Sequence, residues 1–188
     1  ALRRASRNSG AGPGVGIVRE RHTSAKYPQD LNNLRIVIGQ FTELDRLTNE
    51  LADRLRAQHS NVAVINDLDQ HRHAQLANDF AANIYIGIEA RDQQVCEIAY
   101  YQTEGFHSVA AHVFATLAAE TIERSAPWFK PVVNGMRLQV LRETSMPAVV
   151  CGFGPVTRVT PHSAVLADDL ANALSTWVKT TSVKLDAE

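Results

Sequence analysis

Histidine is the residue type that this sequence offers most plainly for metal binding or acid–base chemistry. There are seven: His22, His59, His71, His73, His107, His112 and His162. His71 and His73 are two residues apart, and His107 and His112 are five apart, so neither pair shares one face of a helix. The other three are isolated. The spacing therefore favours solvated or helix-end histidines over a metal site.

The two cysteines are the other candidate nucleophiles or metal ligands. Cys96 and Cys151 each lie in an apolar run, and two cysteines make neither a disulfide framework nor a structural zinc site. Because burial keeps a thiol protonated, we expect inert core thiols in a reducing compartment. No G-x-S-x-G motif for a serine nucleophile is present, and the glycine-rich stretch 10–16 lacks the flanking strand and helix of a phosphate loop.

Alternating strands and helices must position whatever site exists. Short apolar, β-branched runs predict strands at 34–40, 61–67, 83–90 and 94–103. Apolar residues at helical spacing predict helices at 42–58, 71–82, 107–125 and 161–181. The stretch 138–154 holds two more apolar runs around Met146-Pro147.

This alternation predicts an α/β fold, with a mostly parallel sheet of about six strands and helices on both faces. At 188 residues, one domain is the default. We place the domain at 34–182. Residues 1–33 are expected to be a linker and the tail of an upstream region, and 183–188 a C-terminal tail. Thr42, followed by Asp45, is expected to cap the first helix.

The charge balance excludes some classes of partner. The formal net charge is −1, which gives no overall attraction to nucleic acid or to anionic lipid. No apolar stretch approaches the roughly 18 residues of a membrane-spanning helix. The N-terminal stretch also lacks the apolar centre of a signal peptide. We therefore expect a cytoplasmic protein with neither nucleic-acid binding nor membrane insertion.

Two stretches carry a family resemblance: AQLANDFAANIYIGIEA (residues 74–90) and LRETSMPAVV (residues 141–150). With the order of elements from 34 to 180, they resemble the zinc-dependent N-acetylmuramoyl-L-alanine amidases of the third amidase type. The resemblance implies an amidase-like fold. It also implies a site with three zinc ligands and a catalytic glutamate, which can be checked position by position.

Most of that site is substituted in this chain. The first ligand, a histidine, has no counterpart after Gln40. Glu43 falls on the second ligand, at the expected start of the first helix. Glu89 replaces the third ligand, a histidine, and Gly152, beside Cys151, takes the place of the catalytic glutamate. We therefore expect vestigial positions at Glu43, Glu89, Cys151 and Gly152, with no metal cofactor and no catalytic residue.

A fold without its catalytic set implies a binding or regulatory task. The chain resembles cytoplasmic actinobacterial homologues that regulate peptidoglycan precursor synthesis. The implied role is to bind and activate the enolpyruvyl transferase that acts on UDP-N-acetylglucosamine. Such homologues are substrates of a serine/threonine kinase, and Thr180 and Thr181 are candidate phosphorylation sites because we expect them to be exposed.

Two alternatives stay open. The first is a peptidoglycan- or muropeptide-binding module that has kept its affinity without hydrolysis. The second is a residual N-acetylmuramoyl-L-alanine amidase, in which Glu43 and Glu89 form a rearranged site with a histidine such as His71 or His107.

Overall fold

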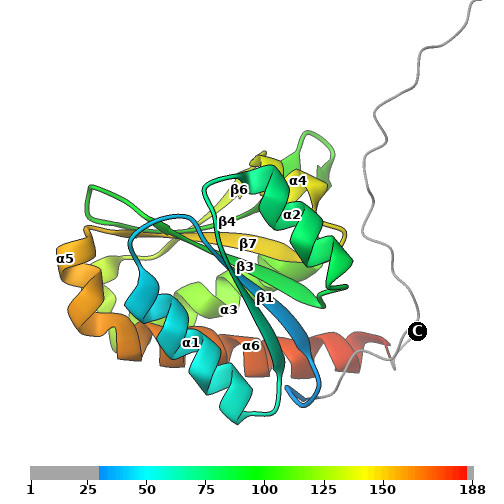
Figure 1. Cartoon of the computed structure of the whole chain (residues 1–188), viewed down its shortest axis with the longest axis horizontal. Coiled ribbons are helices and arrows are strands. Elements are labelled where there is room, and N and C mark those ends of the chain that lie inside the picture. Colours follow the sequence, from blue (N-terminus) through cyan, green and yellow to red (C-terminus); the bar gives the residue numbers. More distant parts are fainter. Residues whose placement is uncertain (1–29, 186–188) are drawn as a thin grey trace, which may run out of the picture.

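The computed structural model of the protein describes residues 30–185, with side chains described as far as Thr181 (Figure 1). Seven strands form one sheet in the order β2-β1-β3-β7-β4-β5, with β6 beside β4. They are β1 (Arg35–Gln40), β2 (Asn61–Asn66), β3 (Ile84–Ala90), β4 (Val95–Thr103), β5 (Phe106–His107), β6 (Val132–Met136) and β7 (Ala148–Gly154).

Most strand pairs are parallel. The pairs β1–β2, β1–β3, β3–β7 and β4–β6 are parallel, whereas β4 runs antiparallel to β7 and to β5. Because β5 has only two residues, six strands make up the body of the sheet. The predicted α/β architecture with about six mostly parallel strands is therefore confirmed.

Helices cover both faces of this sheet. They are α1 (Asp45–Ala57), α2 (Gln70–Asp79), α3 (Val109–Ser125), α4 (Gln139–Glu143), α5 (Val156–Val159) and α6 (Ser163–Leu185), with short 3-10 turns η1 (Pro127–Phe129) and η2 (Thr160–His162). Helices α1, α3 and α6 lie under one face, and α2 and α4 lie over the other (Figure 1). The prediction of helices on both faces is thus also confirmed.

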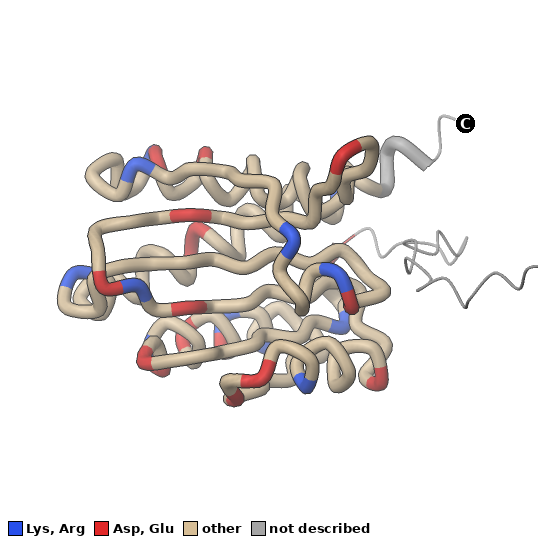
Figure 2. The backbone as a smooth tube through the Cα atoms, turned by 90° about the horizontal axis from the view of Figure 1, so that it is seen from above, with Lys and Arg blue, Asp and Glu red and all other residues tan. Residues whose placement is uncertain are grey.

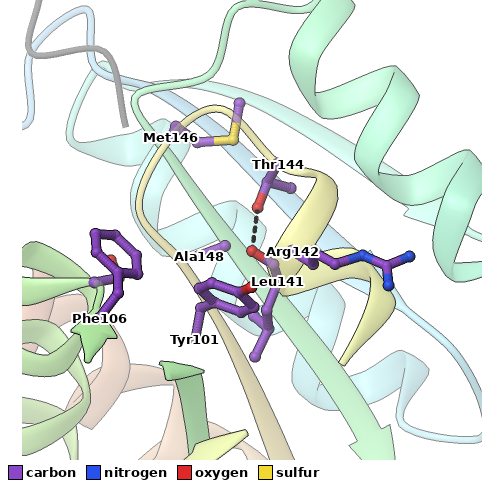
Figure 3. Close-up of a pocket in the computed structure, with 8 residues that line it drawn as sticks. Tyr101, Phe106, Leu141, Arg142, Thr144, Met146 and Ala148 are labelled. Atoms are coloured by element: carbon purple, nitrogen blue, oxygen red, sulfur yellow. Dashed lines mark hydrogen bonds between the residues drawn. The ribbon is translucent and has the colours of Figure 1, made fainter. Parts of the chain in front are cut away.

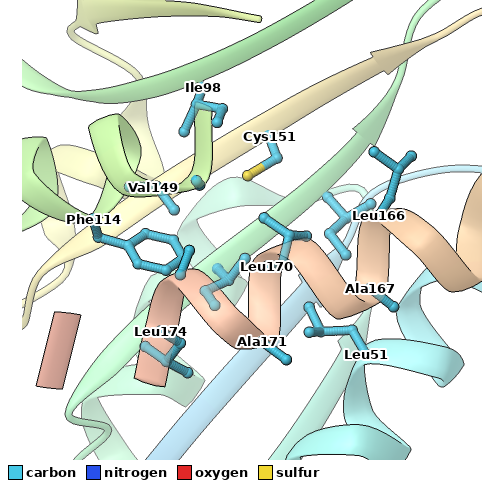
Figure 4. Packing of buried hydrophobic residues seen from close by; sticks show 14 of the residues in the cluster. Leu51, Ile98, Phe114, Val149, Cys151, Leu166, Ala167, Leu170, Ala171 and Leu174 are labelled. Atoms are coloured by element: carbon cyan, nitrogen blue, oxygen red, sulfur yellow. The ribbon is translucent and has the colours of Figure 1, made fainter. Parts of the chain in front are cut away.

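The larger core lies between the sheet and α1, α3 and α6. Leu166, Leu170 and Leu174 of α6 belong to one cluster with Phe114 of α3 and Cys151 of β7 (Figure 4). All seven residues of β7 are buried, which is the pattern of a strand covered on both faces. Such burial on both sides makes the apolar run of β7 the centre of the fold.

Several elements differ from the sequence-based expectation. The strand β6 and the short elements β5 and α5 were not predicted, and the stretch 138–154 resolves into α4 and β7. Helix α1 begins at Asp45 after an uncapped Leu44, so the expected cap at Thr42 is wrong. Leu44 is buried, and this apolar anchor replaces side-chain capping. Leu31, which lies before the expected domain start at residue 34, is part of the larger core. Helix α6 continues to Leu185, past the expected domain end at residue 182.

Charged residues of both signs are spread along the described part of the chain. Acidic and basic residues are interspersed over helices, strands and loops (Figure 2). Within residues 30–185, no helix combines the length and the apolar content that crossing a bilayer requires.

The buried ring of Phe114 gives a direct test of this core. Replacing Phe114 with Ala should lower the free energy of unfolding by about 3–5 kcal/mol, because the side chain is fully buried against α6. Urea unfolding measures the loss. Val109→Ala in the same helix is the control, since Val109 is 57% exposed, and should change stability by less than about 0.5 kcal/mol. A loss below about 1 kcal/mol for Phe114→Ala would contradict the packing described.

Candidate functional site

Glu89 and Gly152, two of the substituted positions of the amidase site, lie in one row across the sheet together with Glu97. Glu89 of β3 is paired with Gly152 of β7, and Gly152 is paired with Glu97 of β4. Residues in register point to the same face, here the face that also carries α2 and α4. The row lies near the carboxyl end of β7, at the end of the sheet that bears the β1–α1 and β3–β4 loops and α5 (Figure 1, left).

The guanidinium of Arg91 lies over Gly152, between the two glutamates of this row. Arg91 directly follows β3, and its Nη2 is 2.9 Å from Glu89 Oε2 and 3.6 Å from Glu97 Oε1. A Cβ atom added to Gly152 would be 2.8 Å from Arg91 Nε. The side chain of Arg91 therefore occupies the space that a side chain at position 152 would need.

Further hydrogen bonds fix the cluster. The backbone N–H of Arg91 donates to the carbonyl of Phe153 at 2.8 Å, which continues the β3–β7 ladder. Asn134 of β6 donates from Nδ2 to Glu97 Oε2 at 2.7 Å. We call Glu89, Arg91, Glu97 and Asn134 the arginine cluster.

Sequence analysis missed Arg91 as a functional residue. A signal was present, because residues 89 and 91 are two apart and lie on one face of an extended chain. The sequence alone does not reveal that β7, with Gly152, and β4, with Glu97, lie next to β3 in that order. Strand order is a property of the fold.

The segment that follows β1 contains no histidine. Gln40 is buried and donates from Nε2 to Asp45 Oδ1 at 2.8 Å, which ties the strand to the start of α1. Phe41 follows, and its ring stacks on His73 with centroids 4.3 Å apart. Glu43 is exposed in the loop before α1, with a left-handed φ of 53°. The expectation that Glu43 begins the helix is therefore wrong.

His73 is a core residue, so the expectation of a solvated or helix-end histidine is wrong for it. Its Nε2 lies 2.9 Å from the carbonyl of Asp67 and its Nδ1 lies 2.7 Å from the hydroxyl of Tyr85. A carbonyl only accepts, so Nε2 carries the proton and Nδ1 accepts from Tyr85. Gly39 leaves room for this pair, because a Cβ there would be 2.2 Å from the Tyr85 hydroxyl.

His71 and His107, the two histidines considered for a rearranged site, have other partners. His71 of α2 pairs with Glu143 of α4 at 2.7 Å, and this hydrogen bond raises the pKa of His71. His107 and His112 pack around Tyr100, with their own ring centroids 5.8 Å apart. A rearranged site joining Glu89 to either His71 or His107 therefore has no geometric support.

Zinc does not fit the donors present. Among residues 30–185, no group of three His, Cys, Asp or Glu side chains is placed to hold a metal ion. Glu89 is engaged with Arg91, residue 152 has no side chain, and the strand β1 ends in Gln40 and Phe41. Three fixed protein ligands are the minimum of a catalytic zinc site.

Both cysteines are buried and unpaired with each other, as the sequence predicts. Burial raises the pKa of Cys96 to about 12 and also raises the pKa of Cys151. Cys151 points into the larger core, on the opposite face from the arginine cluster (Figure 4). Neither thiol takes part in the candidate site.

A hollow lies at the other end of the sheet. Tyr101 and Phe106 border it from β4 and β5, and α4 with the segment that follows it forms the far side (Figure 3). The remaining lining residues are Ser108, Leu141, Arg142, Thr144, Met146 and Ala148. Arg142 extends its guanidinium away from the two rings (Figure 3). Because Ala148 begins β7 whereas Gly152 lies near its end, this hollow is separate from the arginine cluster.

Comparison with solved structures identifies the architecture. An N-acetylmuramoyl-L-alanine amidase, AmiC2 of Nostoc punctiforme, aligns with a TM-score of 0.64 and 14% identity over 79% of this chain and 98% of its own. An amidase of this kind from Clostridium difficile 630 gives 0.61 and 17%, over 79% and 99%. The CwlD amidase of Clostridioides difficile, in complex with the GerS lipoprotein, gives 0.58 and 10%, over 78% and 99%.

The chain has the amidase fold. No protein-family model and no curated protein sequence matches it. At these identities the amidase fold is what is shared, and the chemistry has to be argued from the site itself.

The two candidate phosphorylation sites lie within the last turns of α6. Thr180 and Thr181 are half-buried, so they are less exposed than the sequence suggests. Their hydroxyls donate to the carbonyls of Thr176 at 2.9 Å and Trp177 at 2.7 Å. A kinase would therefore meet both hydroxyls engaged with the helix backbone.

Thiol reactivity tests the burial of the cysteines. At pH 8, neither cysteine of the folded protein should react with Ellman's reagent within minutes, because a thiol with a pKa of about 12 is almost wholly protonated. In guanidinium chloride both of the two cysteines should react. One rapidly reacting thiol in the folded protein would show that the packing around Cys96 or Cys151 is open.

The buried imidazole of His73 predicts a pH dependence of stability. Burial lowers the pKa of His73, so the unfolded chain takes up a proton near pH 6.5 while the folded protein does not. The contribution of His73 to the free energy of unfolding should therefore be fully present above about pH 6.5. Below that pH the free energy of unfolding should fall by up to about 1.4 kcal/mol per pH unit, until the pKa of His73 in the folded protein is reached.

Urea unfolding at several pH values between 8 and 5 measures this loss, with His73→Gln as the comparison. The variant keeps polar atoms at the site but does not titrate, so its stability should fall less steeply with acidification. Equal slopes for the two proteins would show that His73 does not contribute.

Proposed function

We propose that this domain is a catalytically inactive amidase fold that acts as a cytoplasmic regulator of peptidoglycan precursor synthesis. The observation that carries the proposal is the engagement of Glu89 with Arg91 above a side-chain-free Gly152. An amidase mechanism needs a metal-bound water and a carboxylate to take its proton. Neither has a place in the arginine cluster.

The proposed partner is the enolpyruvyl transferase that acts on UDP-N-acetylglucosamine. The argument is the resemblance to the actinobacterial regulator CwlM, in which zinc ligands of an amidase-like domain are substituted. The structure of CwlD in complex with the GerS lipoprotein supports the general point, since there an amidase fold accompanies a protein partner. We propose that this chain likewise acts through protein–protein contact.

Phosphorylation by a serine/threonine kinase is part of the proposal. The structure makes Thr180 and Thr181 costly targets, because phosphorylation would break the bonds to Thr176 and Trp177. It would also add negative charge at a helix C-terminus, where the helix dipole disfavours it. Modification of either residue would therefore be disfavoured while the end of α6 stays helical.

Metal content and hydrolysis test the loss of catalysis. After dialysis against trace zinc, the purified protein should hold well below one zinc per chain, and soluble muropeptides should remain uncleaved. An active amidase such as AmiC2 serves as the positive control. One tightly bound zinc per chain, or metal-dependent release of L-alanyl peptide, would overturn the inactive-domain proposal.

A transferase assay tests the regulatory role separately. Adding the protein, before and after kinase treatment, to the purified enolpyruvyl transferase should raise its rate. A Thr180→Ala/Thr181→Ala variant shows whether these hydroxyls matter. An unchanged rate under all conditions would remove this partner while leaving the loss of catalysis intact.

One observation favours muropeptide binding as a second candidate function. Trp128 of η1 is 39% exposed beside the ring of His162, at 5.2 Å between centroids. Its carbonyl accepts from Gln94, which places it next to the start of β4 and therefore at the carboxyl end of β7. An exposed indole with polar neighbours is a suitable platform for a sugar ring. Calorimetry with a soluble muropeptide, on the wild type and Trp128→Ala, tests this alternative.

A further inference from the structure

We infer that Arg91 takes the place of a bound cation in this domain. Its guanidinium, held by the chain itself, neutralises Glu89 and Glu97 and fills the space above Gly152. The inference rests on the proposed loss of zinc chemistry. Its test reads stability rather than hydrolysis or transferase activation, so each can fail without the other.

The charge argument begins with the sheet. Glu89 and Glu97 lie two strands apart in one row, which places their backbones about 10 Å from each other. Both are less than half exposed, with side-chain exposures of 34% and 21%. Two carboxylates on one face repel each other, and a cation between them offsets that repulsion. The distances from Arg91 Nη2, 2.9 Å and 3.6 Å, are those of that shared cation.

The space argument concerns Gly152. A Cβ there would meet Arg91 Nε at 2.8 Å, Nη2 at 3.4 Å and Cγ at 3.5 Å. Real Cβ atoms essentially never come within 3.0 Å of another heavy atom. A side chain at 152 and the arginine in its present position therefore exclude each other.

The cluster is also held in place from both ends. The backbone of Arg91 is bonded to Phe153, and Asn134 positions the Glu97 carboxylate. Fixing both partners in advance reduces the side-chain entropy that a salt bridge between long side chains otherwise costs. This preorganisation is what distinguishes the cluster from a surface ion pair.

The first experiment compares melting temperatures of the wild type and Arg91→Ala, each with EDTA and with millimolar calcium chloride. The wild type should be insensitive to both. Arg91→Ala should melt about 1–4 °C lower in EDTA, because two carboxylates lose their counter-ion. Calcium, which binds oxygen donors in flexible geometry, should restore part of that loss.

Two variants control this experiment. Arg142→Ala removes another arginine that pairs with a glutamate, Glu143, and should gain no response to calcium. Arg91→Lys keeps a positive charge in the cluster and should likewise gain none. If Arg91→Ala does not fold, the triple variant Arg91→Met/Glu89→Gln/Glu97→Gln should fold, because it removes the carboxylates together with their cation.

A double-mutant cycle tests the geometry. Gly152→Ala should destabilise the wild type modestly, because its Cβ displaces the guanidinium from the two carboxylates, and should destabilise Arg91→Ala less. Additive effects would mean that the glycine is needed for another reason.

Three outcomes would overturn the inference. The first is a response of the wild type to divalent ions, and the second is equal melting temperatures for Arg91→Ala and the wild type. The third is destabilisation of Arg91→Ala without any gain of calcium response. The third outcome, or a triple variant that also fails to fold, would mean that Arg91 is a packing residue only.

Discussion

Strand β7 is the constraint on which the rest of the molecule depends. It pairs in parallel with β3 and antiparallel with β4, and each of its residues is buried. A strand so placed needs apolar cover on both faces, which α6 and α3 give on one side and α4 and α2 on the other. The same pairing fixes the row of Glu89, Gly152 and Glu97. The arginine cluster is therefore a consequence of how β7 is held.

The sequence carried enough information for the architecture and too little for the cluster. Apolar periodicity marks β1, β3, β7, α1 and α6 because burial imposes it directly. β6, with the sequence VVNGM, shows no clear alternation and is only partly buried, so its strand character comes from pairing with β4. Thr42 is a reasonable cap by residue type, but the burial of Leu44 determines where α1 begins.

The candidate site also contains features that the sequence predicts and features that only the fold determines. Motif positions correctly direct attention to Glu89 and Gly152, which the fold places side by side. Arg91 pairs with Glu89 and covers Gly152, and neither composition nor spacing reveals that Glu97 joins them from β4, on the far side of β7. His73 illustrates the reverse error, because a polar residue on a short amphipathic helix is expected to be solvated. Its burial follows from three partners that lie outside its own helix: Phe41, Asp67 and Tyr85.

The attachment of Arg91 to the backbone has a consequence for how such a protein behaves in a changing medium. An ion held by ligands has a dissociation constant, and its occupancy follows its concentration and competes with every chelator nearby. A guanidinium tethered by peptide bonds has neither property. It stays charged throughout the physiological pH range. The carboxyl end of this sheet is thus set at the moment of folding, and scarcity or excess of metal leaves it unchanged.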